Sequence, residues 1–132
     1  MKNYQLIEHA RQAQQHAKAL YSHFKVGAAL LSKSGRVYTG CNIESSSYGL
    51  TLCAERVALF KALSEGEEQF EALAITSSGE GFCPPCGACR QVLWDFANGL
   101  RIILADQKGT EREFALAELL PLAFDGDYLH EK

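Results

Sequence analysis

Two cysteines three residues apart are the strongest chemical signal in the sequence. Cys86 and Cys89 stand in the segment Pro84-Pro85-Cys86-Gly87-Ala88-Cys89, at the predicted start of a helix, where residues three apart share one face. Thiolates bind metals such as zinc, and a helix N-terminus favours the thiolate form of a cysteine. Because zinc takes three or four protein ligands, at least one further ligand is expected elsewhere in the chain.

Cys53 is the predicted third ligand, because it also stands at a predicted helix N-terminus that follows a loop, where open sheets place their sites. Three protein ligands leave a fourth position for water, which is typical of a catalytic zinc site. Zinc lowers the pKa of bound water from ~15.7 towards ~7. A structural zinc site needs a fourth protein ligand, for which Cys41 and Cys83 are the spare candidates. A redox role for Cys86 and Cys89 leaves Cys53 unexplained.

Glu55 lies two residues after Cys53, and residues two apart do not share a helix face. This spacing suits a carboxylate that reaches the bound water better than a second ligand beside Cys53. Three thiolates and one zinc ion leave a net negative site. We therefore hypothesise that Arg56 and Arg90, each beside one of the motifs, offset this charge.

The predicted elements alternate between strands and helices. Strands are predicted over 26–31, 37–41, 70–76, 100–105 and 111–114. Helices are predicted over 4–20, from 51 or 52 to 64, over 86–97 and over 115–120, and residues 121–132 form a tail. Strands joined through helices run parallel, whereas the short turn at 106–110 forces the last strand to be antiparallel to its neighbour. The pattern predicts a mixed five-stranded sheet with helices on both faces.

Length and composition narrow the class of protein. A chain of 132 residues is expected to form one domain over 1–132. The net charge of −3, without a basic stripe, counts against a nucleic-acid partner. No apolar run approaches the ~20 residues of a membrane span. The N-terminus lacks the apolar core of a signal peptide, and five cysteines suit a reducing compartment, so we expect a cytoplasmic protein.

The two cysteine motifs, Thr51-Leu52-Cys53-Ala54-Glu55-Arg56 and Pro85-Cys86-Gly87-Ala88-Cys89-Arg90-Gln91, resemble those of the cytidine deaminase family. Three further segments are similar to the family's first-strand, ribose-binding and C-terminal segments: 21–29, 40–44 and 119–124. The resemblance covers nearly the whole chain. It implies a three-layer α/β/α fold, one Zn²⁺ per subunit, and hydrolytic deamination of cytidine and 2′-deoxycytidine in pyrimidine salvage. Glu55 would then move protons between the water, N3 of the base and the departing amine.

The resemblance also implies the residues that bind the nucleoside. Phe24 would stack on the pyrimidine, Asn42 and Glu44 would bind the ribose hydroxyls, and the backbone of Ala54 would contact the base. The family's short form is a homotetramer with shared active sites, in which Tyr48 and Phe124 would reach a neighbouring subunit. From the pattern alone, Phe24 fits a core position better, Asn42 and Glu44 fit a turn equally well, and Phe124 could anchor the tail to its own domain.

Three alternatives stay open at this point. A blasticidin-type aminonucleoside deaminase shares the three cysteines and Cys-Ala-Glu, although Phe24, Asn42 and Arg56 favour cytidine. A tRNA or purine-base deaminase typically has His-Ala-Glu as its first motif, and its last strands run parallel. Cys53 and the short turn at 106–110 therefore argue against this alternative. A non-catalytic zinc module would keep the cysteines but would not need Glu55.

Overall fold

Five strands form one mixed sheet in the computed structural model, which describes residues 1–129. The strands are β1 (Val26–Ser32), β2 (Val37–Cys41), β3 (Phe70–Ser77), β4 (Arg101–Ala105) and β5 (Glu111–Ala115). Their order is β2-β1-β3-β4-β5, with β3 and β4 parallel and the other neighbouring pairs antiparallel. The predicted mixed sheet with an antiparallel last strand is confirmed. The end of the predicted tail and of the predicted domain, 130–132, lies outside the described residues.

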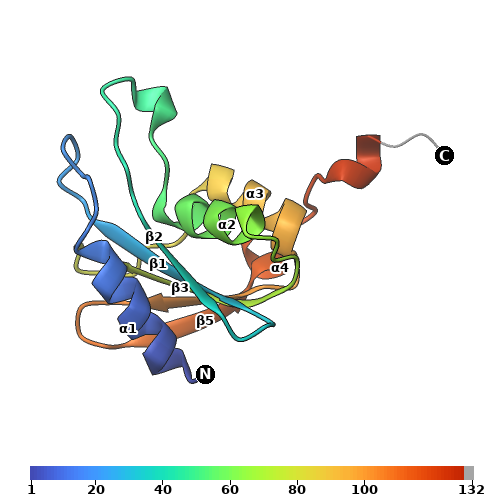
Figure 1. Cartoon of the computed structure of the whole chain (residues 1–132), viewed down its shortest axis with the longest axis horizontal. Helices are drawn as coiled ribbons and strands as arrows, with labels where there is room; N and C mark the ends of the chain where they lie inside the picture. Colours follow the sequence, from blue (N-terminus) through green and yellow to red (C-terminus); the bar gives the residue numbers. More distant parts are fainter. Residues whose placement is uncertain (130–132) are drawn as a thin grey trace.

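Helices cover both faces of the sheet, as predicted (Figure 1). On one face lies α1 (Asn3–Gln14); on the other lie α2 (Ala54–Ser64), α3 (Gly87–Ala97) and the short α4 (Leu116–Leu119). Neighbouring residues of β1 point to opposite layers, so Leu30 packs in the α2–α3 core and Leu31 packs in the α1 core. Burial on both faces explains why β1 reads as a continuous apolar run and not as an alternating one.

The first helix is shorter than predicted. It ends at Gln14, and the helical spacing of Ala17 and Leu20 was a misleading signal, since Leu20 is exposed. The backbone of Lys18 instead pairs with the segment that follows β2. The Lys18 N–H donates to the Asn42 carbonyl (2.9 Å), and the Lys18 carbonyl accepts from the Glu44 N–H (3.0 Å). Ending the helix early therefore ties the segment before β1 to the segment after β2.

Two segments project from the body of the molecule in Figure 1. One is the loop after β2, which carries the 3-10 helix Tyr48–Leu50, and the other is the C-terminal arm, which carries the 3-10 helix Gly126–Leu129. Among residues 1–129, no helix has both the length and the apolar character needed to cross a membrane.

Candidate metal centre and adjoining cavity

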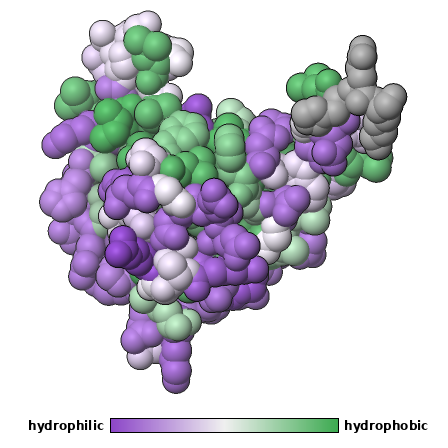
Figure 2. All heavy atoms as spheres, turned by 45° about the vertical axis from the view of Figure 1, so that its right-hand side comes forward, coloured by the Kyte–Doolittle hydropathy of each residue, from purple (hydrophilic) through white to green (hydrophobic). Residues whose placement is uncertain are grey.

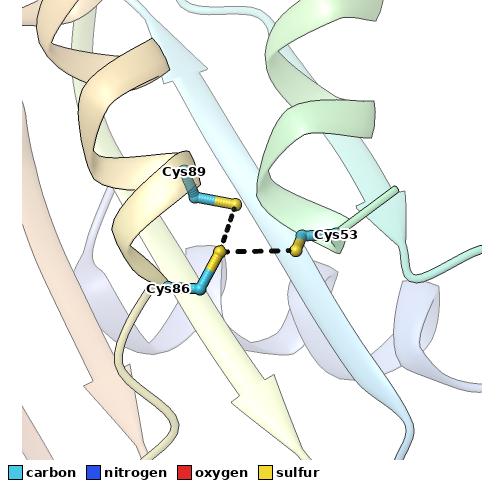
Figure 3. A group of neighbouring side chains, drawn as sticks. All are labelled: Cys53, Cys86 and Cys89. Carbon is cyan, nitrogen blue, oxygen red and sulfur yellow. Dashed lines mark hydrogen bonds between the residues drawn. The ribbon is translucent and has the colours of Figure 1, made fainter. Parts of the chain in front are cut away.

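The three predicted metal ligands meet between the N-terminal ends of α2 and α3. Cys53 and Cys86 are the N-cap residues of these helices, and Cys89 lies in the first turn of α3. The helix α2 begins two or three residues later than the predicted start at 51 or 52, and α3 begins one residue later than the predicted start at 86. Their thiols point toward one another (Figure 3). The Sγ atoms of Cys53 and Cys86 are 3.6 Å apart, and those of Cys86 and Cys89 are 3.4 Å apart.

The thiol triad, Cys53, Cys86 and Cys89, fits zinc. A Zn–S bond of about 2.3 Å in tetrahedral geometry places sulfur atoms about 3.8 Å apart, only slightly more than the separations seen here. All three sulfur atoms lie within 4.8 Å of one another, and within residues 1–129 no fourth Cys, His, Asp or Glu joins the group. Neither Cys41 nor Cys83 therefore completes a four-ligand structural site. Three protein ligands are the arrangement of a catalytic zinc site.

The surroundings of the thiol triad favour the thiolate form at Cys53. The pKa of Cys53 is lowered to about 5, mainly by a hydrogen bond from the Cys89 thiol and in smaller part by Arg56, against the opposing effect of burial. The same hydrogen bond, together with burial, raises the pKa of Cys89. Cys53 is thus prepared to bind a cation, as expected of a thiol at a helix N-terminus beside an arginine.

The two arginines that flank the motifs differ in what they contact. Nη2 of Arg56 lies 3.5 Å from the Cys53 sulfur, and its Nε is buried without a hydrogen-bond partner. Arg90 instead donates to the carbonyl oxygens of Pro85 (2.7 Å) and Leu119 (2.8 Å). The hypothesis that Arg90 offsets the thiolate charge is therefore not supported by its contacts, which tie the loop before α3 to the end of α4.

Glu55 is buried in the first turn of α2, with only 4% of its surface exposed. Burial raises the pKa of its carboxyl group to about 7, because a charged carboxylate is stabilised less in the interior than in water. Glu55 also lines the cavity described next, together with Cys53 and Cys86. A carboxyl group with a pKa near neutrality can both accept and donate a proton at physiological pH.

A cavity of about 240 Å³ adjoins the thiol triad, and its wall is mostly apolar. Of the residues predicted to bind substrate, Phe24, Asn42, Glu44 and Ala54 line it. The lining residues that sequence reasoning missed are Ser22, Val26, Thr51, Leu52, Cys83 and Pro84. Thr51 and Leu52 could have been predicted to line the site, because they directly precede Cys53 in the sequence. Cys83 was considered only as a spare candidate for a fourth zinc ligand; burial raises its pKa to about 11.

Asn42 and Glu44 hold the chain segment that enters β1. The Asn42 amide accepts from the Val26 N–H (2.9 Å) and donates to the Phe24 carbonyl (2.8 Å). The Glu44 carboxylate accepts from the Ser22 hydroxyl and from the N–H groups of Tyr21 and Ser22, and these hydrogen bonds lower its pKa. Both side chains line the cavity and keep unused hydrogen-bonding capacity, because an amide nitrogen has two protons and a carboxylate has about four lone-pair sites.

Neither of the two residues predicted to serve a neighbouring subunit lines the cavity beside the thiol triad. Tyr48 is exposed and contacts the Tyr21 ring edge-on, with 5.7 Å between the ring centres. It lines a second cavity that shares Ser22, Glu44 and Thr51 with the first. Phe124 is exposed on the C-terminal arm, where its ring stacks on that of Tyr128 at 5.3 Å. The structure of the single chain does not bring Phe124 to its own cavity. Apolar surface shows as green in the hollow between the two projecting segments (Figure 2).

Comparison with known proteins gives one consistent result. The family model described as "Cytidine and deoxycytidylate deaminase zinc-binding region" matches residues 1–104. The chain is 49% identical to a cytidine deaminase of Sporosarcina psychrophila over 125 residues, which cover 94% of this chain and 92% of that protein. It is 46% identical to a cytidine deaminase of Halalkalibacterium halodurans over 127 residues, 96% of each protein.

Solved structures agree with the sequence relatives. The 1.6 Å crystal structure of cytidine deaminase from Burkholderia pseudomallei superposes with a TM-score of 0.91 at 46% identity, covering 94% of this chain and 100% of that one. The crystal structure of cytidine deaminase from Mycobacterium tuberculosis superposes with a TM-score of 0.82 at 41% identity, covering 94% and 98%.

Proposed function

The chain belongs to the cytidine and deoxycytidylate deaminase zinc-binding family, and from this premise we propose that it is a zinc-dependent cytidine deaminase. The reaction is hydrolysis of cytidine or 2′-deoxycytidine to uridine or 2′-deoxyuridine, with release of ammonia. One observation carries the proposal: a three-thiol metal site and a buried carboxyl group, Glu55, adjoin the same cavity. A non-catalytic zinc module would have no use for that carboxyl group.

Cys53, Cys86 and Cys89 are the residues that would hold one zinc ion per chain, through their three sulfur atoms. When bound, zinc makes a water molecule acidic enough to act as a nucleophile near neutral pH and stabilises the negative charge that develops on oxygen. Arg56, at 3.5 Å from the Cys53 sulfur, offsets part of the charge of the three thiolates. The N-terminal ends of α2 and α3 contribute in the same direction.

Glu55 carries the protons of the reaction. It takes a proton from the attacking water and delivers one to N3 of the base, which makes C4 more electrophilic. It then takes the remaining proton from the hydroxyl group added at C4 and passes it to the amine, which leaves as ammonia while the C4 carbonyl forms. The burial of Glu55 and its pKa of about 7 support this role, since a general acid–base works best when its pKa lies near the operating pH.

The cavity wall supplies the contacts to the nucleoside. Phe24 stacks on the pyrimidine, the backbone of Ala54 contacts the base, and Asn42 and Glu44 bind the ribose hydroxyls. Among the described residues that line this cavity, none is Lys or Arg, whereas Glu44 and Glu55 are both present. A 5′-phosphate would therefore find no cationic partner in the wall. This favours a neutral nucleoside over deoxycytidylate as the substrate.

The test is incubation of the purified, zinc-loaded protein with cytidine, followed by absorbance and by ammonia release. Uridine and ammonia should form in equal amounts, with one zinc ion per chain. Deoxycytidylate and a blasticidin-type aminonucleoside serve as comparison substrates and should react far more slowly. No ammonia from cytidine at full zinc content would contradict the proposal, and faster release from the aminonucleoside would reassign the substrate.

We also infer a homotetramer with active sites shared between subunits. In its support, the loop after β2 and the C-terminal arm both leave large apolar side chains exposed, including Tyr48, Leu50, Phe124 and Tyr128. Such surface is typical of interfaces between subunits. The five free cysteines, three of which must be reduced to bind zinc, are in keeping with the reducing conditions of the cytoplasm.

A further inference from the structure

The backbone on either side of Phe24 is held by hydrogen bonds. The Phe24 N–H donates to the Ser22 hydroxyl (3.0 Å), and the Phe24 carbonyl accepts from the Asn42 amide (2.8 Å). The next residue, Lys25, is paired twice with Ser78: the Lys25 N–H donates to the Ser78 hydroxyl (3.0 Å), and the Ser78 N–H donates to the Lys25 carbonyl (2.8 Å). The loop after β3 is thereby fastened to the segment that carries the Phe24 ring.

Gly79, the next residue of that loop, lies directly against this ring. A Cβ atom on Gly79 would come within 2.8 Å of Cε1 and 3.5 Å of Cζ of Phe24, and carbon atoms pack at about 3.5–4.0 Å. The N–H of Gly79 donates to the Ser77 hydroxyl (3.2 Å). Ser77 closes the ladder between β1 and β3, where it pairs with Val26. Gly79 is therefore held in place from the end of β3, and only its lack of a side chain admits the ring.

We propose that Gly79 is a positioning residue for nucleoside binding, because its bare backbone lets the Phe24 ring take its place in the wall of the cavity. This inference rests on the proposed role of Phe24 in stacking on the pyrimidine. Gly79 does not line the cavity itself. Its effect on the substrate passes through the Phe24 ring.

The site differs from the other close approaches of glycine in the fold. At Gly27 and Gly40, an added Cβ would meet backbone atoms of α1 and α2, which cannot move without moving a helix. At Gly79, the nearest atoms are the far edge of an exposed side chain, which can turn away. The cost of an added methyl group at Gly79 therefore falls on the ring orientation and not on the fold.

The test is the variant Gly79→Ala, with Gly81→Ala as the matched control in the same loop. A Cβ at Gly81 has nothing within 4 Å. For Gly79→Ala we expect KM for cytidine to rise about tenfold, since stacking of a base on an aromatic ring contributes on this scale. We expect kcat, zinc content and melting temperature to stay near the values of the unchanged protein. Loss of substrate binding without loss of turnover changes KM and leaves kcat unchanged.

A double-mutant cycle separates a positioning role from a structural one. In the Phe24→Ala background there is no ring to displace, so Gly79→Ala should add nothing to the rise in KM. An equal rise in both backgrounds, or a Gly79→Ala protein that behaves like Gly81→Ala, would overturn the inference while cytidine deamination by the unchanged protein still stood. If the unchanged, zinc-loaded protein fails to deaminate cytidine, the proposed function fails first.

Discussion

Arg56 contacts the thiol triad directly, and its position shows how single residues set the chemistry of this site. Its guanidinium group lies 3.5 Å from the Cys53 sulfur and lowers the pKa of that thiol. The charge of three thiolates would otherwise make a bound water less acidic. Arg56 is thus one of the residues that contact the metal ligands and, through them, adjust the properties of the bound metal.

The variant Arg56→Ala should lose zinc to a chelator more readily, with an affinity reduced by about tenfold or more. The rising limb of its pH–rate profile should shift to higher pH, because the more negative site makes the bound water harder to ionise. Competition with a chelator and a pH series of kcat/KM measure the two effects. Arg101→Ala, which removes a partly exposed arginine paired with Glu113, is the control. Unchanged zinc affinity together with an unchanged pH profile would remove Arg56 from the account.

Residue types and spacing predicted this site well where the chemistry is local. Cys53, Cys86 and Cys89 were predicted from metal-ligand chemistry at helix starts, and their group was found in the structure. The partners of Arg90 could not be predicted in this way, because Leu119 reaches it only through the packing of α4 against α3. The same holds for Gly79, whose contact with Phe24 joins residues far apart in the sequence.

At the scale of elements, the turn between β1 and β2 is fastened to the segment after α2. The Glu67 carboxylate accepts hydrogen bonds from the Ser34 hydroxyl (2.7 Å) and the Tyr38 hydroxyl (3.1 Å). These contacts, that of Ser34 above all, lower the pKa of Glu67 below its ordinary value of 4.5. A carboxyl group with a lowered pKa in the folded state stabilises the fold above its unfolded pKa and loses this effect as the pH falls.

The variant Glu67→Gln should therefore melt below the unchanged protein at pH 7, and the gap should close as the pH falls below about 4.5 and through the folded pKa. Thermal melts across this range measure the gap. Glu68→Gln, a change at an exposed neighbour, should lower the melting temperature only slightly, both at pH 7 and at low pH. A Glu67→Gln gap that is constant with pH would show that the charge of Glu67 does not support this turn.

The elements themselves followed from apolar periodicity and turn residues, with one informative error. The helix predicted over 4–20 ends at Gln14, because backbone pairing of Lys18 with Asn42 and Glu44 replaces its last turns. Such long-range backbone pairing leaves no local signal, so helical spacing alone could not reveal it. The antiparallel β4–β5 pair, by contrast, was predictable because a short turn leaves the chain no room to cross over.

At the scale of the whole molecule, the two projecting segments leave large apolar side chains exposed within one chain. Tyr48 and Leu50 on the first, and Phe124 and Tyr128 on the second, are all exposed. Other copies of the chain would cover this surface in the proposed homotetramer. From the sequence, the homotetramer was predicted only through the family resemblance. The exposure of these residues could not be predicted, because it depends on how the two segments project from the folded domain.

Light scattering should therefore give the mass of four chains for the unchanged protein. Tyr48→Asp should shift the assembly toward smaller species, because a carboxylate placed in an apolar interface is costly to bury. Zinc content should stay near one ion per chain, while activity falls with the assembly. Tyr4→Asp, a change at another exposed tyrosine on α1, is the control and should keep the four-chain mass. A fully active single chain would rule out shared active sites.

The central claim is that the thiol triad holds zinc while Glu55 moves the protons, and the variant Glu55→Gln tests it most directly. Gln has nearly the same shape but cannot carry a proton, so the variant should keep its melting temperature and one zinc ion per chain. Its kcat for cytidine should fall by a factor of about 10² to 10⁴, the usual contribution of general acid–base catalysis. A zinc-loaded Glu55→Gln protein that deaminates cytidine at close to the unchanged rate would contradict the account.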